Sequence, residues 1–584
     1  MKKQLLSLGC ALLMAFSLSS TAWGLTVEFD KIGTIVSAPD STFAASDYRP
    51  AMAIDAQGNQ IVSGLIGTDF EFAGVTVGSE VDGSHYLLKY DAEGKEMWAA
   101  TFLGATITAL TTDPEGNVYA AASFGESALI YAAGETVDLQ GDLMGARSAV
   151  IVKLSADGKV LDKNVLTPAL HSDWGDEGFA LDAPRAWFEQ LAYENGRLYG
   201  SLVNTGLLKE GKDGEIDLTA PYVNMWGMIL LQPTGFYVEF AESGSVSIKK
   251  VLSSVGMVKG SEETATVQRP IFTIDNGVMY QAASVSGVFN YTAPDGATTL
   301  YEKANHQGFL LGTVALDGSS SASNVWMSSM ESTPIDTLQD VNGEDSLVIW
   351  QDAVGGHYNY ITDIAVNNGR IFVAGVFDVA SCPFAKDVPF AGTMDAFIAA
   401  VYPDLKTVAY VKASGLDEGT DIKTAYETVG GFSSQWDRVV LLATASDKID
   451  HVFQQTARLI VHPFTYEATE HSISGEFFPM NAVSQGRTAV IALANNNGDV
   501  AFSKENVTPS AVEEIEANAE DVVESTMVSD VIAFNKAVNA TLTTTTGVPL
   551  KTVENATEMS VSEYPAGYYL LIVDGAQAVK IVKL

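Results

Sequence analysis

The sequence is poor in cysteine and in basic residues, and each shortage excludes a class of protein. The 584-residue chain has two cysteines, Cys10 and Cys382, and the first lies in the N-terminal apolar stretch. Once that stretch is removed, no intramolecular disulfide can form, so stability must come from packing. Lysine and arginine total 33 against 72 acidic residues, which gives a formal net charge of −39. We therefore expect neither nucleic acid nor anionic lipid as a partner.

Long apolar runs are also scarce, and only residues 1–24 have the character of a targeting segment. Lys2 and Lys3 precede an apolar core, and small residues follow it up to Gly24. This order predicts a secretory signal peptide. Lipidation of Cys10 is the alternative, but the apolar stretch before Cys10 is short and continues beyond it. We expect an exported chain, at the cell surface or extracellular, without a transmembrane helix.

The common catalytic and metal-binding motifs are absent. The sequence contains no H-E-x-x-H, no G-x-S-x-G, no phosphate loop with its lysine and no C-x-x-C. We expect a binding function and no resident cofactor, with calcium left open as a ligand of acidic loops. Two alternatives remain: a glycoside hydrolase or lyase acting on polysaccharide, because no spacing selects or rejects a carboxylate pair, and a structural surface-layer component.

Glycine is abundant, with 51 residues against 18 prolines, and it recurs in a turn that runs into a strand. Two clear copies are "DAQGNQIVSGL" (55–65) and "DPEGNVYAAAS" (113–123). The aspartate can accept a hydrogen bond from the backbone two residues on, and the glycine adopts positive φ at little cost. Seven copies, aligned on the residue after the turn glycine or its equivalent, fall at Asn59, Asn117, Arg197, Val278, Arg370, Arg438 and Arg487.

Hairpin patterns follow several copies, for example at 85–102, 149–166 and 397–414. Repeated four-stranded units without a helical pattern predict an all-β fold, a β-propeller over residues 25–505 with seven blades. Tandem β-sandwiches are the alternative. Because the seventh copy has too little chain after it, we expect a strand from residues 25–39 to complete the last blade.

Polar and aromatic residues in the expected loops are candidates for ligand binding. Carboxylates suit hard cations, and exposed aromatic rings stack on sugars. Solvated loops or core packing are the competing interpretation. The candidates are His171, Asp173, Trp174, Asp176, Glu177, Trp226, His357, Tyr358 and Tyr360. The ligand could be a polysaccharide or a surface protein.

Residues 51–165 resemble the SBBP-type propeller repeats of exported bacterial proteins. Those repeats share an A-x-D-x-x-G-N-x-Y-x-x-G opening and a D-x-x-x-x-K-x-D-x-x-G-x-x-x-W close. The matching residues are Asp55, Gly58, Asn59, Gly64, Asp82, Lys89, Asp91, Gly94 and Trp98. These are turn and packing positions, so the resemblance implies a fold and no particular activity.

The chain changes character after about residue 506. Residues 506–525 are rich in acids and lack a base, which predicts a linker or short helix, and residues 526–584 have the pattern of a small β-sandwich. This last segment resembles the C-terminal sorting domain of the type IX secretion system of Bacteroidetes, although a threonine run replaces the usual aromatic-bearing strand. The resemblance implies the secretion machinery as a partner. It is carried by Gly547, Pro565, Gly567, Tyr569, Lys580 and Lys583.

Overall fold

The computed structural model describes residues 31–35 and most of 49–506 and 523–583. The larger gaps are 171–178, 259–264, 318–323, 328–333, 340–344, 351–359, 417–425 and 447–452, and gaps of one to four residues occur elsewhere. The described elements are all strands. Among them there is no helix with the length and apolar character that a bilayer crossing requires. The chain divides into two compact units, the first ending at Glu505 and the second beginning at Asn506.

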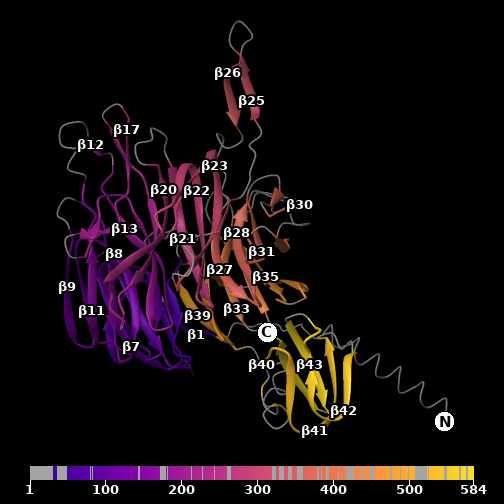
Figure 1. The fold of residues 1–584 in the computed structure, drawn as a ribbon. Coiled ribbons are helices and arrows are strands. Elements are labelled where there is room, and N and C mark those ends of the chain that lie inside the picture. The colour runs from indigo at the N-terminus through magenta and orange to yellow at the C-terminus, as the bar shows by residue number, and fades with distance from the viewer. Residues whose placement is uncertain are drawn as a thin grey trace. The chain divides into compact units, whose positions relative to one another are not determined.

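In the described part of the first unit, strand pairing gives seven successive antiparallel groups of four strands (Figure 1). The first two groups share the long strand β7. They consist of β2 (Met52–Ile54), β3 (Gln60–Leu65), β6 (His85–Tyr90) and the first half of β7 (Glu96–Thr112), then the second half of β7 with β8 (Val118–Ala132), β10 (Ser148–Leu154) and β11 (Val160–Leu166). The third and fourth are β13 (Ala186–Glu194), β14 (Arg197–Asn204), β19 (Thr234–Phe240) and β20 (Ile248–Met257), then β21 (Ala265–Asp275), β22 (Val278–Thr292), β23 (Thr298–Ala315) and β24 (Asn324–Met327). The fifth and sixth are β27 (Tyr360–Asn367), β28 (Arg370–Phe377), β31 (Asp395–Val401) and β32 (Val408–Ala413), then β33 (Tyr426–Gln435), β34 (Arg438–Ser446), β35 (Phe453–Val461) and β36 (Ala468–Ile473). The last is β37 (Phe478–Gln485), β38 (Thr488–Ala494), β39 (Val500–Asn506) and β1 (Lys31–Ile35).

These groups are the blades of a closed ring. The innermost strands β2, β7, β13, β21, β27, β33 and β37 contact one another in that order, and β37 contacts β2 again. The N-terminal strand β1 is the outermost strand of the last blade, where Ile35 pairs with Val500 of β39. The expected all-β propeller, with an N-terminal strand in its last blade, is therefore confirmed.

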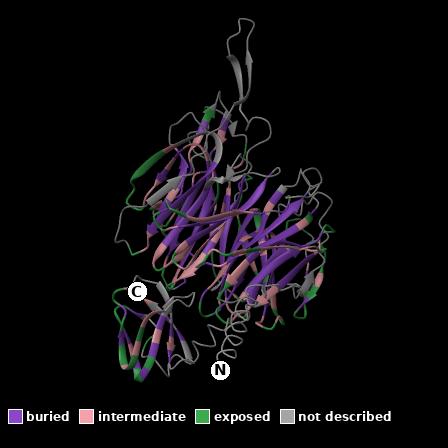
Figure 2. Cartoon of the chain, turned by 90° about the vertical axis from the view of Figure 1, so that its right-hand side faces the viewer, coloured by how far each residue is buried: buried purple, intermediate pink, exposed green. Residues whose placement is uncertain are grey.

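Apolar side chains between neighbouring blades form the core. Ile61, Leu87 and Phe102 of the first blade pack with Val118 and Phe124 of the second. A comparable cluster joins the last blade to the first, and it contains Val62, Tyr86 and Leu88 together with Val490 and Phe502. Strands in the middle of the blades, such as β6, β19, β31 and β34, are accordingly buried along their whole length, whereas the outer strands β11 and β32 are mostly not (Figure 2). Ring closure thus rests on apolar packing as well as on strand pairing.

One end of the ring, here called the turn end, carries the connections within each blade from first to second and from third to fourth strand. At Asp55, Oδ1 accepts hydrogen bonds from the backbone N–H groups of Gln57 (3.0 Å) and Asn59 (2.9 Å). Gly58 and Gly116 adopt φ of 81°, as the tight turn requires. Asp113 repeats the arrangement with Asn117. The recurring acidic motif therefore shapes turns.

The opposite end, the loop end, carries all of the other connections. An antiparallel blade places its second-to-third connection and its link to the next blade on the same side. The accessory strands lie in these connections: β4 (Phe70–Phe72), β5 (Val75–Val77), β9 (Glu135–Gln140), β12 (Phe179–Ala180), β15 (Lys209–Glu210), β16 (Ile216–Asp217), β17 (Tyr222–Met225), β18 (Met228–Leu231), β25 (Pro334–Gln339), β26 (Asp345–Trp350), β29 (Ser381–Cys382) and β30 (Ala385–Pro389). In Figure 1 β12, β17, β26 and β30 mark this end.

The second unit is built from five strands in the order β40-β44-β43-β41-β42. Their bounds are β40 (Met527–Val528), β41 (Val531–Thr544), β42 (Pro549–Ser560), β43 (Gly567–Val573) and β44 (Gln577–Lys583). Register shifts interrupt β41 between Ala533 and Ala540, and bulges of this kind bend a strand. Leu542, Tyr569, Leu571 and Ile581 lie in its core.

Candidate functional site

A cavity of about 640 Å³ lies among the inner strands of the ring. Six of the seven innermost strands, or the residues directly before them, line it. At β2 the lining begins at Arg49, before the strand, and in β13 it begins at Trp187, the second residue. Leu65, at the end of β3, and His85, at the start of β6, also line it. These positions place the cavity toward the loop end.

Irregular backbone recurs along the wall of this cavity. Six inner strands have a register shift near the same level, for example between Phe188 and Gln190 in β13 and between Ile361 and Asp363 in β27. A β-bulge changes which side chains face a given side. The polar residues Gln190, Asp363 and Asn481 each directly follow such a shift, and all three line the cavity.

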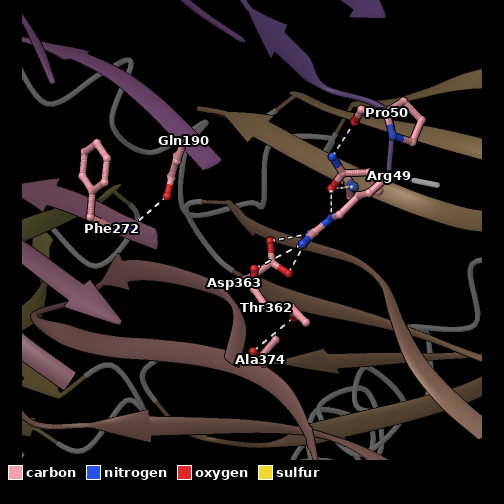
Figure 3. Close-up of polar contacts among 9 residues, drawn as sticks. Arg49, Pro50, Gln190, Phe272, Thr362, Asp363 and Ala374 are labelled. Atoms are coloured by element: carbon pink, nitrogen blue, oxygen red, sulfur yellow. Dashed lines mark hydrogen bonds and ion pairs between the residues drawn. The ribbon is translucent and has the colours of Figure 1, made fainter. Parts of the chain in front are cut away.

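Arg49 joins three blades within the cavity wall (Figure 3). Its Nη2 donates to both carboxylate oxygens of Asp363, at 2.6 and 2.7 Å, and its Nη1 donates to the Thr362 carbonyl at 3.1 Å. Its Nε donates to Asn481 Oδ1 at 3.0 Å, while Asn481 Nδ2 donates to the Pro50 carbonyl at 2.7 Å. All three guanidinium nitrogens of Arg49 thus have partners inside the protein, and Arg49 and Asp363 form a latch between blades.

The wall between β13 and β21 has a different character. The Gln190 side-chain oxygen accepts the Phe272 N–H at 2.7 Å and ties the two strands together (Figure 3). On β13, the half-buried Trp187 donates from Nε1 to Glu189 Oε1 at 2.7 Å. On β21, Arg269 is exposed and its guanidinium lies 4.9 Å from the centre of the Tyr360 ring. An aromatic ring, a carboxylate and a cation therefore lie along this wall.

A second cavity, of about 460 Å³, adjoins the first between the third and fourth blades. Trp187, Glu189 and Arg269 line both cavities. Arg185 and Asp182, which form an exposed ion pair at 3.6 Å, also line the second. Both volumes lie in the range of small-ligand sites, roughly 300–1,000 Å³. The three shared residues thus mark the centre of a composite site.

His85 is the group with the clearest electrostatic perturbation in the first cavity. Burial lowers its pKa from the usual 6.5 to about 4, so its imidazole is neutral at neutral pH.

The described residues contain no group of three or more His, Cys, Asp or Glu side chains placed to hold a metal ion.

Most candidates taken from the sequence lie outside the described residues. These are His171, Asp173, Trp174, Asp176, Glu177, Trp226, His357 and Tyr358. Tyr360 is described, and it contacts Arg269 of the cavity wall. Of the sorting-motif residues, Gly547 and Pro565 also lie outside. Gly567 begins β43, Tyr569 is buried there, and Lys580 and Lys583 belong to β44.

The sequence did not single out Arg49, Trp187, Glu189, Arg269 or Asp363. One signal was present, since Gln190 and Asp363 lie seven positions before the repeat positions Arg197 and Arg370. A polar residue there interrupts a strand that is otherwise mostly apolar or small. Gln190 and Asp363 are also the residues that follow the bulges in β13 and β27.

Comparison with known proteins gives no relative that assigns an activity. No family model matches the chain, and no curated protein matches it. Among solved structures, the chain is similar to a polysaccharide lyase, Uly1, with 11% identity and a TM-score of 0.38 over 84% of this chain and 94% of that chain. The β-propeller domain of Cps50 (Swd1) from Myceliophteria thermophila gives 10% identity and 0.32 over 82% and 99%. A puromycin hydrolase gives 11% and 0.35, and there 80% of this chain matches about half, 53%, of that chain.

Proposed function

We propose that the chain is an exported binding protein that holds a glycan at the loop end of its propeller. The convergence of Trp187, Glu189 and Arg269 between two adjoining cavities carries this proposal. Sugars are bound by an aromatic face together with a few placed donors and acceptors. The β13–β21 wall offers this combination within a space of small-ligand size.

Binding fits the two carboxylates of the first cavity better than glycoside hydrolysis does. Hydrolysis uses one carboxyl group as a general acid and another as nucleophile or base. Both oxygens of Asp363 accept hydrogen bonds from Arg49, so this carboxylate is already engaged inside the protein. Glu189 accepts from Trp187. Asp363 therefore suits the structural latch.

A glycan array combined with a hydrolysis assay tests this proposal. The chain beginning at Leu25 should bind one or more oligosaccharides and release no shortened product. Release of a shortened product would contradict the binding proposal and support the alternative of a hydrolase or lyase. Failure to bind any glycan would contradict the proposal.

For the second unit we propose the role of a type IX secretion sorting domain, in a chain exported through a signal peptide at residues 1–24. The resemblance of residues 526–584 supports this role, as does the core position of Tyr569, next to the last strand β44. The SBBP-type resemblance of residues 51–165 is compatible with such export, since those repeats occur in exported proteins.

A reporter fused to residues 506–584 tests the sorting role in a bacterium that has type IX secretion. Deleting residues 580–584 should leave the reporter inside the outer membrane, because it removes four of the seven residues of β44. Glu558→Gln, at an exposed position of β42, should leave secretion unchanged. Secretion of the truncated reporter at the full level would refute the role.

A further inference from the structure

The wall between β13 and β21 points to the chemical class of the glycan. We propose that the composite site binds an acidic sugar, with Arg269 contacting its carboxylate and Trp187 stacking on its ring. This inference rests on the proposed glycan-binding function and adds the charge of the ligand to it.

Arg269 differs from the other arginines that line the two cavities. Arg49 is paired with Asp363, and Arg185 is paired with Asp182. Among the described residues, no carboxylate lies within ion-pair distance of Arg269, whose contact is the Tyr360 ring. Within the described part of the chain, the Arg269 guanidinium therefore makes no ion pair that would compete with a ligand. A planar guanidinium suits two-pronged binding of a carboxylate.

The backbone at Arg269 is also unusual. Its φ is 47°, in the left-handed region that L-residues with long side chains rarely adopt. The residue lies in the register shift between Gln268 and Ile271, and the Phe272 N–H just beyond the shift is held by Gln190. Strained backbone of this kind is retained where the surroundings fix it, often at ligand sites. The bulge and the Tyr360 ring together position the guanidinium before any ligand arrives.

The neighbouring residues favour a sugar over an acidic peptide. Glu189 is fixed by the Trp187 Nε1–H at one oxygen, and its carboxylate has further acceptor capacity for hydroxyl donors. Sugar hydroxyls supply such donors, whereas an ionised aspartate or glutamate side chain has no donor for Glu189 and no ring to stack on Trp187. An acidic sugar can stack on Trp187, place its carboxylate on Arg269 and donate a hydroxyl to Glu189.

The net charge of −39 does not oppose this assignment at physiological salt. Charges on the surface are screened beyond about 8 Å at 0.15 M ionic strength. The local set of Arg269, Arg185, Asp182 and Glu189 therefore decides the electrostatics of the site. Two of these four groups neutralise each other.

Titration with matched sugars tests the inference at 0.15 M salt. The probes are oligogalacturonate, oligoguluronate, a hyaluronan oligosaccharide and sialyllactose, each paired with its carboxyl-reduced form. We expect at least one acidic probe to bind the chain about tenfold more tightly than its reduced partner, since one charge-assisted contact is worth on the order of a factor of ten. Arg269→Gln should remove this preference. Arg147→Gln, at an exposed arginine that lines neither cavity, should preserve it.

Two further variants test whether the Tyr360 ring positions Arg269 for binding. Tyr360→Phe keeps the ring beneath the guanidinium and should retain the preference, while Tyr360→Leu should reduce it severalfold. Equal affinity for every acidic and reduced pair, or a preference that survives Arg269→Gln, would overturn the inference and leave glycan binding intact. Absence of binding to any sugar would refute the proposed function itself, and with it this inference.

Discussion

At the scale of single residues, the turn aspartates Asp55 and Asp91 make the same backbone hydrogen bonds in different surroundings. Both accept from the N–H groups two and four residues on. Asp55 also pairs with Lys89 at 2.9 Å, and their side chains are 0% and 1% exposed. The Lys89 ammonium donates in addition to the Gly116 carbonyl in the next blade. The first turn is thus tied into the blade interface, and the second is not.

Asp55→Ala should therefore destabilise the first unit far more than Asp91→Ala does. The first change leaves the buried Lys89 ammonium without its carboxylate partner. This loss costs about 3–5 kcal/mol. The second removes turn hydrogen bonds in a more exposed setting and should cost about 1 kcal/mol. Urea unfolding of the two variants measures the difference. Equal losses would show that the buried pair has no special weight.

A second prediction at the residue scale concerns His85 and pH. Its folded-state pKa of about 4 lies below the value near 6.5 of an unfolded histidine. As pH falls from about 6.5 toward 4, the unfolded chain therefore takes up a proton that the folded chain excludes, and stability is lost, by up to roughly 3 kcal/mol. His85→Gln should flatten the difference in unfolding free energy between pH 7 and pH 4.5. A variant with the same pH slope as the unmodified chain would contradict this account.

At the scale of elements, β33 is the inner strand from which no described residue lines the first cavity. It carries Gly430 and Gly431 where other inner strands carry larger residues, and it packs closely against β37. A Cβ added at Gly430 would lie 2.3 Å from the Pro479 carbonyl oxygen and 2.5 Å from Thr444 Oγ1. The close approach of these two strands thus requires glycine.

Gly430→Ala should destabilise the first unit by about 1–3 kcal/mol, because backbone would have to move to relieve the overlap. Gly125→Ala is the matched control, since nothing lies within 4 Å of its added Cβ. Thermal unfolding of both variants tests the contrast. A stable Gly430→Ala variant would mean that β33 and β37 separate easily.

Elements also show which features the sequence could predict. The turns were predictable because Asp55, Gly58 and Asn59 interact with one another over four residues. The latch was not, because Arg49 and Asp363 are 314 positions apart. The side of β27 on which Asp363 lies depends moreover on the bulge after Ile361. This bulge breaks the alternation of side chains between the two faces of the strand, on which sequence patterns rely.

At the scale of the whole molecule, β1 joins the start of the ring to its end. It pairs with β39, so its loss should leave the last blade with three strands and expose the edge of β39. Deleting residues 25–39 should lower the unfolding midpoint of the first unit by on the order of 5 °C or more. Deleting residues 25–30 alone, which leaves β1 in place, should have little effect. An unchanged midpoint after the longer deletion would argue against this closure.

The ring as a whole was predictable because each blade repeats a local pattern, and the pairing of β1 followed from the shortage of chain after the seventh copy. The composite site was less accessible to sequence reasoning. Its members Trp187, Glu189 and Arg269 come from two blades and are brought together by the order of the inner strands. Only Tyr360 among the candidates taken from the sequence touches this site within the described residues.

The central claim is that a glycan binds where Trp187, Glu189 and Arg269 meet. The most direct measurement is the affinity of the chain and of Trp187→Ala for an oligosaccharide that the chain binds. Tyr131→Ala is the control, since this exposed aromatic residue lines neither cavity. We predict a loss of about tenfold or more for Trp187→Ala, in line with a stacked ring, and none for Tyr131→Ala. Unchanged affinity of the Trp187→Ala variant would contradict the account.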